Sequence, residues 1–239
     1  TNMKVQVIGS GSMWTKYNSA CYLIDDSIMV DIPNGACKYL YRFNIEPSSI
    51  EHILITHFHG DHYFDMPFYL LNKSKSDNKK VNVYCDKQGE EKINKIGELA
   101  FPQVFNLISK ELTVEYNFED EFSVEKYQVK KVLVDHGRLK PCFGYIIDNE
   151  SNKVGFTGDT ALCSTVEEMT KTCKYLFCDC MLINGTNKHQ GINDIEYLAN
   201  KYPNCTFVVS HLNDDTRKTL EEKNISNIIV PDDGLELKI

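Results

Sequence analysis

Three histidines and one aspartate fall within six residues of the segment ITHFHGDH, residues 55–62. Neutral imidazole is the commonest metal ligand in proteins, and carboxylates supply the negative charge that a cation needs. Alternation along a single strand does not explain the segment, because Gly60 interrupts it. We expect a strand at Ile53–Ile55 to end and release a loop. The segment therefore predicts a metal site built from His57, His59, Asp61 and His62.

Three later segments place a histidine or an aspartate directly after an apolar strand. VKKVLVDHG contains His136, KVGFTGDT contains Asp159, and CTFVVSHL contains His211. Strand ends are rigid, so side chains there can be held within the tolerance of a metal site. Together with residues 57–62, these three are expected to form one site. His52 precedes a strand outside these motifs, and we interpret it as structural.

Short strands and helices alternate around these motifs. β-Rich segments open the chain (KVQVIG, SACYLID, SIMVDI) and recur between Leu112 and Phe156. Helices are predicted at residues 36–43, 64–71, 87–99, 164–171, 194–202 and 215–223. No Gly/Ser-rich linker divides the chain, so we expect one domain over residues 1–239. Two sheets packed face to face, with helices outside, would bury this pattern well.

The composition narrows the functional class. The chain has 239 residues, enough for a substantial core, and a formal net charge of −8. That charge argues against broad nonspecific nucleic-acid binding, which needs a dense positive surface. No run approaches the 18 apolar residues of a membrane span. Nine cysteines without a disulfide-like spacing predict reduced thiols and a cytoplasmic protein.

The order of these motifs resembles the metallo-β-lactamase superfamily: HxHxDH, a histidine, the aspartate of TGDT, then a late histidine after a strand. VIGSGSMWTKYNSACYLID, HQGINDIEYLANKY and the closing IVPDDGLELKI are similar to its ribonuclease Z-like phosphodiesterase branch. The resemblance covers nearly the whole chain. It implies the α/β class and an αββα sandwich: two facing mixed β-sheets, helices on the outer faces, and two divalent metal ions at one edge.

The resemblance also implies a role for each metal-site residue. His57, His59 and His136 would bind the first ion. Asp61, His62 and His211 would bind the second, and Asp159 would bridge the two. Nitrogen-rich ligation with carboxylates suits Zn²⁺, with Mn²⁺ or Fe²⁺ as alternatives. Asp61 is also a candidate to polarise metal-bound water.

His189, in the segment KHQG, is surplus to this ligand set. In the resembling phosphodiesterases the matching histidine lies near the scissile phosphate and assists the leaving alkoxide. A protonated imidazole there can donate a proton to the alkoxide, which is otherwise a poor leaving group. We therefore predict catalytic roles for Asp61 and His189 in a phosphodiesterase. The alternatives for His189 are a cap on the helix that begins near Asn193, or plain exposure.

The spacing of the motifs bears on the substrate. Ribonuclease Z-like tRNA enzymes usually carry a long arm between the third-motif histidine and the bridging aspartate, but 22 residues separate His136 from Asp159. VDIPNGACKYL also lacks their Gly-Glu-x-x-x-Gln pattern. We predict a small phosphodiester substrate, with a cyclic nucleotide first. The alternatives are tRNA 3′-processing, a carbonyl hydrolase of the lactonase or β-lactamase type, or a non-hydrolytic member of the fold. The resemblance also suggests a homodimer.

Four further residues are candidates for substrate binding. Trp14 and Phe58 are predicted to stack on a base. Arg138 and Lys140 follow His136 and are predicted to contact phosphate. For each of them, plain packing or surface exposure is the alternative.

Overall fold

The computed structural model describes residues 2–239 and contains two seven-stranded sheets. The first sheet has the order β14-β1-β2-β3-β4-β5-β6. Its strands are β1 (Lys4–Gly9), β2 (Cys21–Ile24), β3 (Ile28–Val30), β4 (His52–Leu54), β5 (Lys80–Tyr84), β6 (Thr113–Asn117) and β14 (Glu236–Lys238). The two ends of the chain meet here, since β14 pairs with β1.

The second sheet has the order β13-β12-β11-β10-β9-β8-β7. Its strands are β7 (Glu121–Val124), β8 (Tyr127–Val134), β9 (Cys142–Asp148), β10 (Lys153–Phe156), β11 (Tyr175–Asp179), β12 (Thr206–Ser210) and β13 (Ile228–Ile229). Both sheets mix parallel and antiparallel pairs, as predicted.

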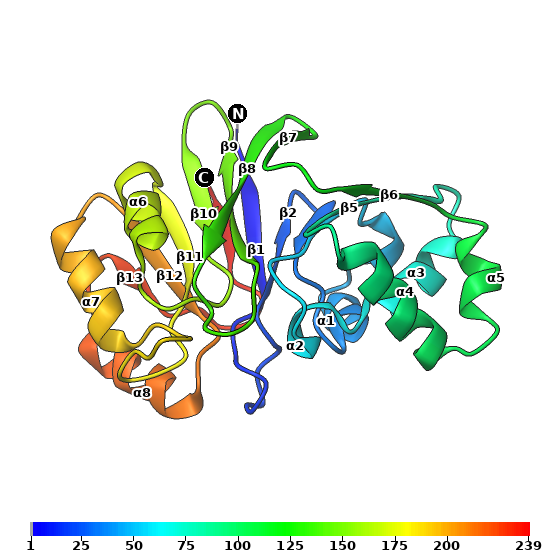
Figure 1. The fold of residues 1–239 in the computed structure, drawn as a ribbon. Helices are drawn as coiled ribbons and strands as arrows, with labels where there is room; N and C mark the ends of the chain where they lie inside the picture. Colours follow the sequence, from blue (N-terminus) through cyan, green and yellow to red (C-terminus); the bar gives the residue numbers. More distant parts are fainter. Residues whose placement is uncertain (1) are drawn as a thin grey trace.

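Helices cover the outer faces of the paired sheets. Figure 1 shows α1–α5 on one side and α6–α8 on the other. They are α1 (Ala36–Arg42), α2 (Gly60–Tyr63), α3 (Met66–Ser74), α4 (Gly89–Ala100), α5 (Phe105–Ser109), α6 (Ser164–Thr172), α7 (Ile192–Lys201) and α8 (Asp214–Lys223), with a 3₁₀ turn at Pro47–Ser49. None of these helices in residues 2–239 has the length and apolarity to cross a membrane.

Three apolar clusters fill the three interfaces between layers. The central cluster joins the sheets, with Tyr22 of the first sheet packing on Phe156 and Phe177 of the second at ring-centroid distances of 5.1 and 5.3 Å. A second cluster packs the first sheet against α1, α3 and α4, and a third packs the second sheet against α6, α7 and α8. Such burial on both faces of each sheet stabilises a four-layer sandwich. The predicted αββα fold is thus confirmed.

Strand direction brings the carboxyl ends of several strands to one edge of each sheet. Strands β3 to β6 are parallel, and so are β10 to β13. Strand β8 runs with β10, because both are antiparallel to β9. The segments after β3, β4, β8, β10, β11 and β12 therefore begin at these carboxyl edges, where the candidate site lies.

The helix predicted at residues 64–71 differs from the structure. A single turn, α2, begins at Gly60 inside the histidine motif, and α3 begins only at Met66. Between them, the Asp65 carboxylate accepts hydrogen bonds from the main-chain nitrogens of Gly35 and Cys37, at 2.9 and 2.7 Å. The five-residue helix α5 was not predicted, because so short a segment shows little hydrophobic periodicity.

Candidate metal centre

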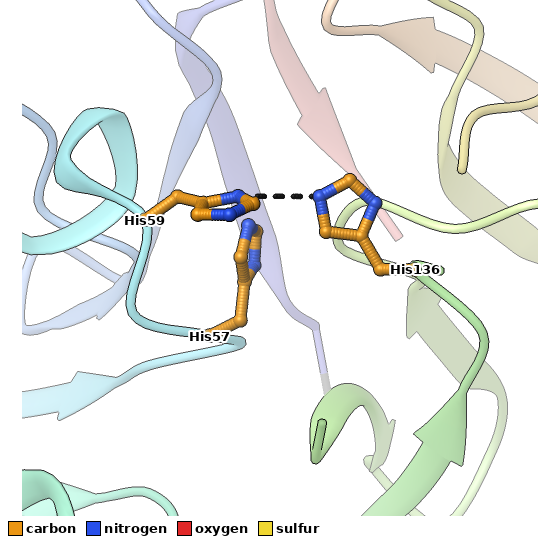
Figure 2. Close-up of side chains that lie close together, drawn as sticks. All are labelled: His57, His59 and His136. Atoms are coloured by element: carbon orange, nitrogen blue, oxygen red, sulfur yellow. Dashed lines mark hydrogen bonds between the residues drawn. The ribbon is translucent and has the colours of Figure 1, made fainter. Parts of the chain in front are cut away.

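The structure brings the seven predicted ligand residues together. His57, His59 and His136 present ligand-type atoms within 4.8 Å of one another, and so do Asp61, His62, Asp159 and His211. In Figure 2 the three imidazoles of the first group converge, with His59 Nδ1 3.3 Å from His136 Nε2.

One carboxylate oxygen, Asp159 Oδ2, joins the two groups. It lies 3.5 Å from His57 Nε2 and 3.8 Å from His136 Nε2 in the first group. In the second group it lies 3.1 Å from His62 Nε2 and 3.3 Å from His211 Nε2. This central position is the one that a bridging ligand would need.

Unusual backbone geometry places two of these side chains. Gly158, in the TGDT turn, has a φ of +62°, and a Cβ there would lie 2.8 Å from Thr56 Cβ. Glycine is therefore required for the close approach that positions Asp159. His211 has a φ of +57°, in the left-handed region that non-glycine residues rarely adopt. Such strain persists where the surroundings hold it in place, as at functional sites.

Burial and neighbouring charges shift the pKa values of the histidines in opposite directions. Burial, assisted by the nearby His62, lowers the pKa of His57 to about 3. Burial also acts to lower the pKa of His211, but Asp159 and Asp61 outweigh it and raise that pKa to about 9. Although burial opposes its ionisation, Asp159 has a pKa well below its usual range because His211 and His62 stabilise the carboxylate.

The donor set fits divalent cations. Five imidazoles and two carboxylates are the ligand types that Zn²⁺ accepts, and they also suit Mn²⁺ or Fe²⁺. The Nε2 atom of His57 is buried and makes no hydrogen bond within residues 2–239. Buried polar atoms normally have a partner, and a metal ion would provide one. The structure thus holds candidate His/Asp metal sites, while the assignment of each ligand stays a prediction.

His189 lies beside this cluster. Its ring stacks on His211 at a centroid distance of 5.3 Å and meets His136 edge-on at 4.8 Å. Its Nδ1 lies 2.7 Å from Asp179 Oδ2. The alternative role as a helix cap does not fit, because α7 begins after Gly191, whose main-chain nitrogen donates to Asp194.

A cavity of about 710 Å³ opens over the cluster. Its lining includes His59, Asp61, His136, Asp159, His189 and His211, together with Arg138, Lys188, Asn34, Met13 and Phe64. Ligand-binding sites commonly have this size. The cavity therefore gives a small molecule direct access to the cluster.

Only one of the four predicted substrate-binding residues lines this cavity, namely Arg138. Phe58 instead packs edge-on against Tyr63 at 4.9 Å, and the Lys92 ammonium lies 5.1 Å from its ring centroid. Trp14 is 76% exposed and outside the lining, although its neighbour Met13 belongs to it. Lys140 is exposed and also outside the lining.

Four residues that contact the cluster were not predicted from the sequence: Asp31, Thr56, Asp179 and Lys188. Asp31 Oδ2 lies 2.7 Å from His62 Nδ1, and the Lys188 carbonyl oxygen lies 2.7 Å from His136 Nδ1. Both aspartates lie at the carboxyl ends of buried strands, in VDI and CDC, as the predicted ligands do. That placement was the available signal.

His52, interpreted as structural, does lie away from the site, with hydrogen bonds to Tyr84 and Glu125.

A family model described as "Anti-Pycsar protein Apyc1" matches residues 3–232. The chain belongs to this family. Curated relatives named ribonuclease Z include those of Pyrococcus abyssi (28% identity over 131 residues) and an Exiguobacterium species (29% over 153 residues). The matches cover 54% and 61% of this chain but only 41% and 49% of those relatives.

Solved structures share the fold of this Apyc1-family protein over nearly the whole chain. The metallo-β-lactamase fold protein YhfI of Bacillus subtilis has a TM-score of 0.80 at 14% identity and covers 100% of both chains. A diphosphatase of the PhnP family has a TM-score of 0.76 at 16% identity, with coverage of 98% and 97%. Human tRNase Z, short form, has a TM-score of 0.72 at 18% identity, with 98% of each chain covered. The predicted resemblance to the superfamily and to its ribonuclease Z-like branch is confirmed.

Proposed function

We propose that this Apyc1-family protein is a metal-dependent phosphodiesterase that hydrolyses a small phosphodiester, with a cyclic nucleotide as the first candidate. The observation that carries the proposal is the position of His189, which lines the cavity beside the His/Asp cluster and is held there by Asp179. Hydrolysis of a carbonyl substrate depends more on an oxyanion hole than on an acid for the leaving group, so it should tolerate the loss of His189 better.

In this proposal His57, His59 and His136 hold one divalent ion, Asp61, His62 and His211 hold a second, and Asp159 bridges them. Zn²⁺ is the first candidate. Two such ions, when bound, activate water and stabilise the charge that develops in phosphodiester hydrolysis. The main-chain carbonyl of Lys188, 2.7 Å from His136 Nδ1, orients that ring so that Nε2 faces the cluster.

His189 has the geometry of a general acid. Its Nδ1 is engaged by Asp179, so Nε2 is the ring nitrogen available to a molecule in the cavity. A proton on Nε2 can pass to the oxygen of the departing alkoxide. Asp61 is the candidate to orient the attacking water, since its carboxylate also lines the cavity.

The surroundings of the cavity support a small substrate. Strands β9 and β10 form a plain hairpin between His136 and Asp159, with a short turn at residues 149–152, so no long arm is present there to hold a folded RNA. The Apyc1 family match, with its anti-Pycsar description, supports a cyclic nucleotide.

The test is hydrolysis of 3′,5′-cyclic nucleotides and of bis(p-nitrophenyl) phosphate with Zn²⁺ or Mn²⁺ present. Wild type would be compared with His189→Ala, and with His52→Ala as a histidine control remote from the site. We expect wild type and His52→Ala to cleave a cyclic nucleotide, and His189→Ala to lose about 10²–10⁴-fold in kcat while keeping its metal content.

Two outcomes would contradict the proposal. If the fully metallated protein cleaves no phosphodiester but opens nitrocefin or a lactone, it is a carbonyl hydrolase. If it processes only a pre-tRNA, it is a ribonuclease. This is the second candidate, because the curated relatives are named ribonuclease Z. A homodimer is also proposed, on the family resemblance alone, and light scattering coupled to size-exclusion chromatography would check it.

A further inference from the structure

The carboxylate of Asp31 contacts the Nδ1 side of His62, opposite the Nε2 atom that faces Asp159. Asp31 follows β3, is 4% exposed and has a φ of +64°. Its Oδ2 lies 2.7 Å from His62 Nδ1 and 2.7 Å from the hydroxyl oxygen of Thr56. Its Oδ1 accepts a hydrogen bond of 2.8 Å from the Thr56 main-chain nitrogen. As a carboxylate, Asp31 has no hydrogen to donate, so it accepts from the Thr56 amide, the Thr56 hydroxyl and the His62 ring.

Thr56 extends this network to a second histidine. Its hydroxyl oxygen lies 2.9 Å from His57 Nδ1. A hydroxyl carries one hydrogen, and that hydrogen is committed to Asp31, which cannot donate. His57 must therefore be the donor, with its hydrogen on Nδ1. The same reasoning places a hydrogen on His62 Nδ1, which also faces Asp31.

Both imidazoles consequently present Nε2 toward Asp159, at 3.5 Å for His57 and 3.1 Å for His62. We infer that Asp31 and Thr56 form a relay that fixes the tautomer of His57 and His62 together, with Asp31 as a positioning residue for both ion sites. This inference rests on the proposed function, in which His57 belongs to one ion and His62 to the other.

The fold holds the relay rigidly. Strands β3 and β4 pair in parallel with Val30 opposite Leu54, and the Asp31 nitrogen donates to the Leu54 carbonyl at 2.8 Å. Thr56 is 1% exposed, and Gly158 packs against its side chain. Because water has little access, the two side chains have few competing partners, and the hydrogen-bond directions are fixed.

The two members of the relay should have different effects on metal binding. Thr56→Val keeps the shape of the side chain and removes only the hydroxyl, so it should weaken the ion that His57 holds and spare the other. Asp31→Asn should weaken both ions, because the amide has one acceptor oxygen in place of two and cannot accept from the Thr56 amide, the Thr56 hydroxyl and the His62 ring together. Loss of such an orienting partner typically reduces metal affinity about 10–100-fold. Thr56→Ser keeps the hydroxyl and is the matched control.

Zinc stoichiometry by mass spectrometry and zinc affinity by chelator competition measure these effects, with thermal unfolding of the metal-free variants as the control for folding. We expect two ions in wild type and Thr56→Ser, one tight and one weakened ion in Thr56→Val, and two weakened ions in Asp31→Asn. In zinc-loaded, ¹⁵N-histidine-labelled protein, long-range ¹H–¹⁵N spectra should show Nδ1–H tautomers for His57 and His62, with the His57 signal altered in Thr56→Val.

The relay is wrong if Thr56→Val binds both ions as tightly as wild type, or if His57 carries its hydrogen on Nε2 in wild type. Either result would leave the phosphodiesterase proposal standing, provided that wild type still binds metal and cleaves a phosphodiester. Wild-type protein that binds no metal would instead overturn the proposed function, and the relay with it.

Discussion

Asp179 holds His189 through a hydrogen bond of 2.7 Å between Asp179 Oδ2 and His189 Nδ1. The carboxylate is itself fixed, since Oδ2 also accepts from the Thr160 main-chain nitrogen at 3.1 Å and Oδ1 from that of Met181 at 3.0 Å. The Asp179 side chain is fully buried and that of His189 is 16% exposed. The pair therefore connects the end of β11 to the wall of the cavity.

Asp179→Asn should selectively slow the hydrolysis of substrates with poor leaving groups. The amide is a weaker partner for a protonated His189, so we expect kcat on a cyclic nucleotide to fall about 10–100-fold. Bis(p-nitrophenyl) phosphate should be affected far less, because p-nitrophenolate leaves without a proton. The measurement is kcat/KM for both substrates, and equal losses on the two would argue against an acid role.

Without the proposed metal ions, the protein should have a lower Tm and should not hydrolyse its substrate. Metal at a thousandfold excess over its Kd stabilises the folded state by about 4 kcal/mol, roughly 10 °C in Tm for a chain of this size. His59→Ala should reduce this gain while leaving the metal-free Tm nearly unchanged, because His59 is exposed. His189→Ala is the control that should keep the full gain. Calorimetry with and without EDTA tests both expectations, and an unchanged wild-type Tm would contradict them.

The basic residues near the cavity should differ in their effect on substrate binding. Arg138 and Lys188 line the cavity, whereas Lys140 does not. Because the lining residues are exposed, each contact with phosphate should be modest, and Arg138→Ala or Lys188→Ala should raise KM about 2–5-fold. Lys140→Ala, a matched change two residues from Arg138, should leave KM unchanged. Steady-state kinetics at low salt would measure this, and equal effects at residues 138 and 140 would count against a specific phosphate contact.

The predicted stacking role of Trp14 can be tested by fluorescence, since Trp14 is the only tryptophan of the chain. It is 76% exposed beside Met13, which lines the cavity. If it stacks on a base, a hydrolysis-resistant cyclic nucleotide should change its emission, and ribose 5-phosphate should not. Trp14→Ala should then raise KM for nucleotides several-fold. An emission spectrum that nucleotide leaves unchanged would remove Trp14 from the substrate contacts.

Stability in acid should depend on Glu167, which ties α6 to α7. One of its carboxylate oxygens accepts from Lys201, Tyr202 and Tyr197 at 2.8–2.9 Å. These hydrogen bonds, that of Lys201 first, lower the pKa of Glu167 from 4.5 to about 2. A lowered folded-state pKa means that the stabilisation is present above pH 4.5 and is lost as the pH falls toward 2.

Glu167→Gln should therefore be less stable than wild type at pH 7, and the gap should close as the pH falls from 4.5 toward 2. Urea unfolding of both proteins in metal-free form, at a series of pH values, would show it. A gap that stays constant with pH would mean that the charge of Glu167 contributes nothing.

The fold class and the candidate ligands could be predicted from the sequence, because both leave local signals in it. Hydrophobic periodicity predicts the strands and helices, and His136, Asp159 and His211 each follow an apolar strand. The spacing within residues 57–62 is equally local. Because parallel strands end at the same edge of a sheet, residues that directly follow them lie at that edge.

The residues that orient the histidines could not be predicted from the sequence and are visible only in the folded chain. Asp31 and Asp179 meet His62 and His189 through contacts across the fold or between loops, and an aspartate after a strand does not reveal its partner. The structure also decided the direction of Phe58, which turns away from its two histidine neighbours to pack on Tyr63. Side-chain direction and long-range proximity depend on how the layers pack, and local spacing carries no record of that packing.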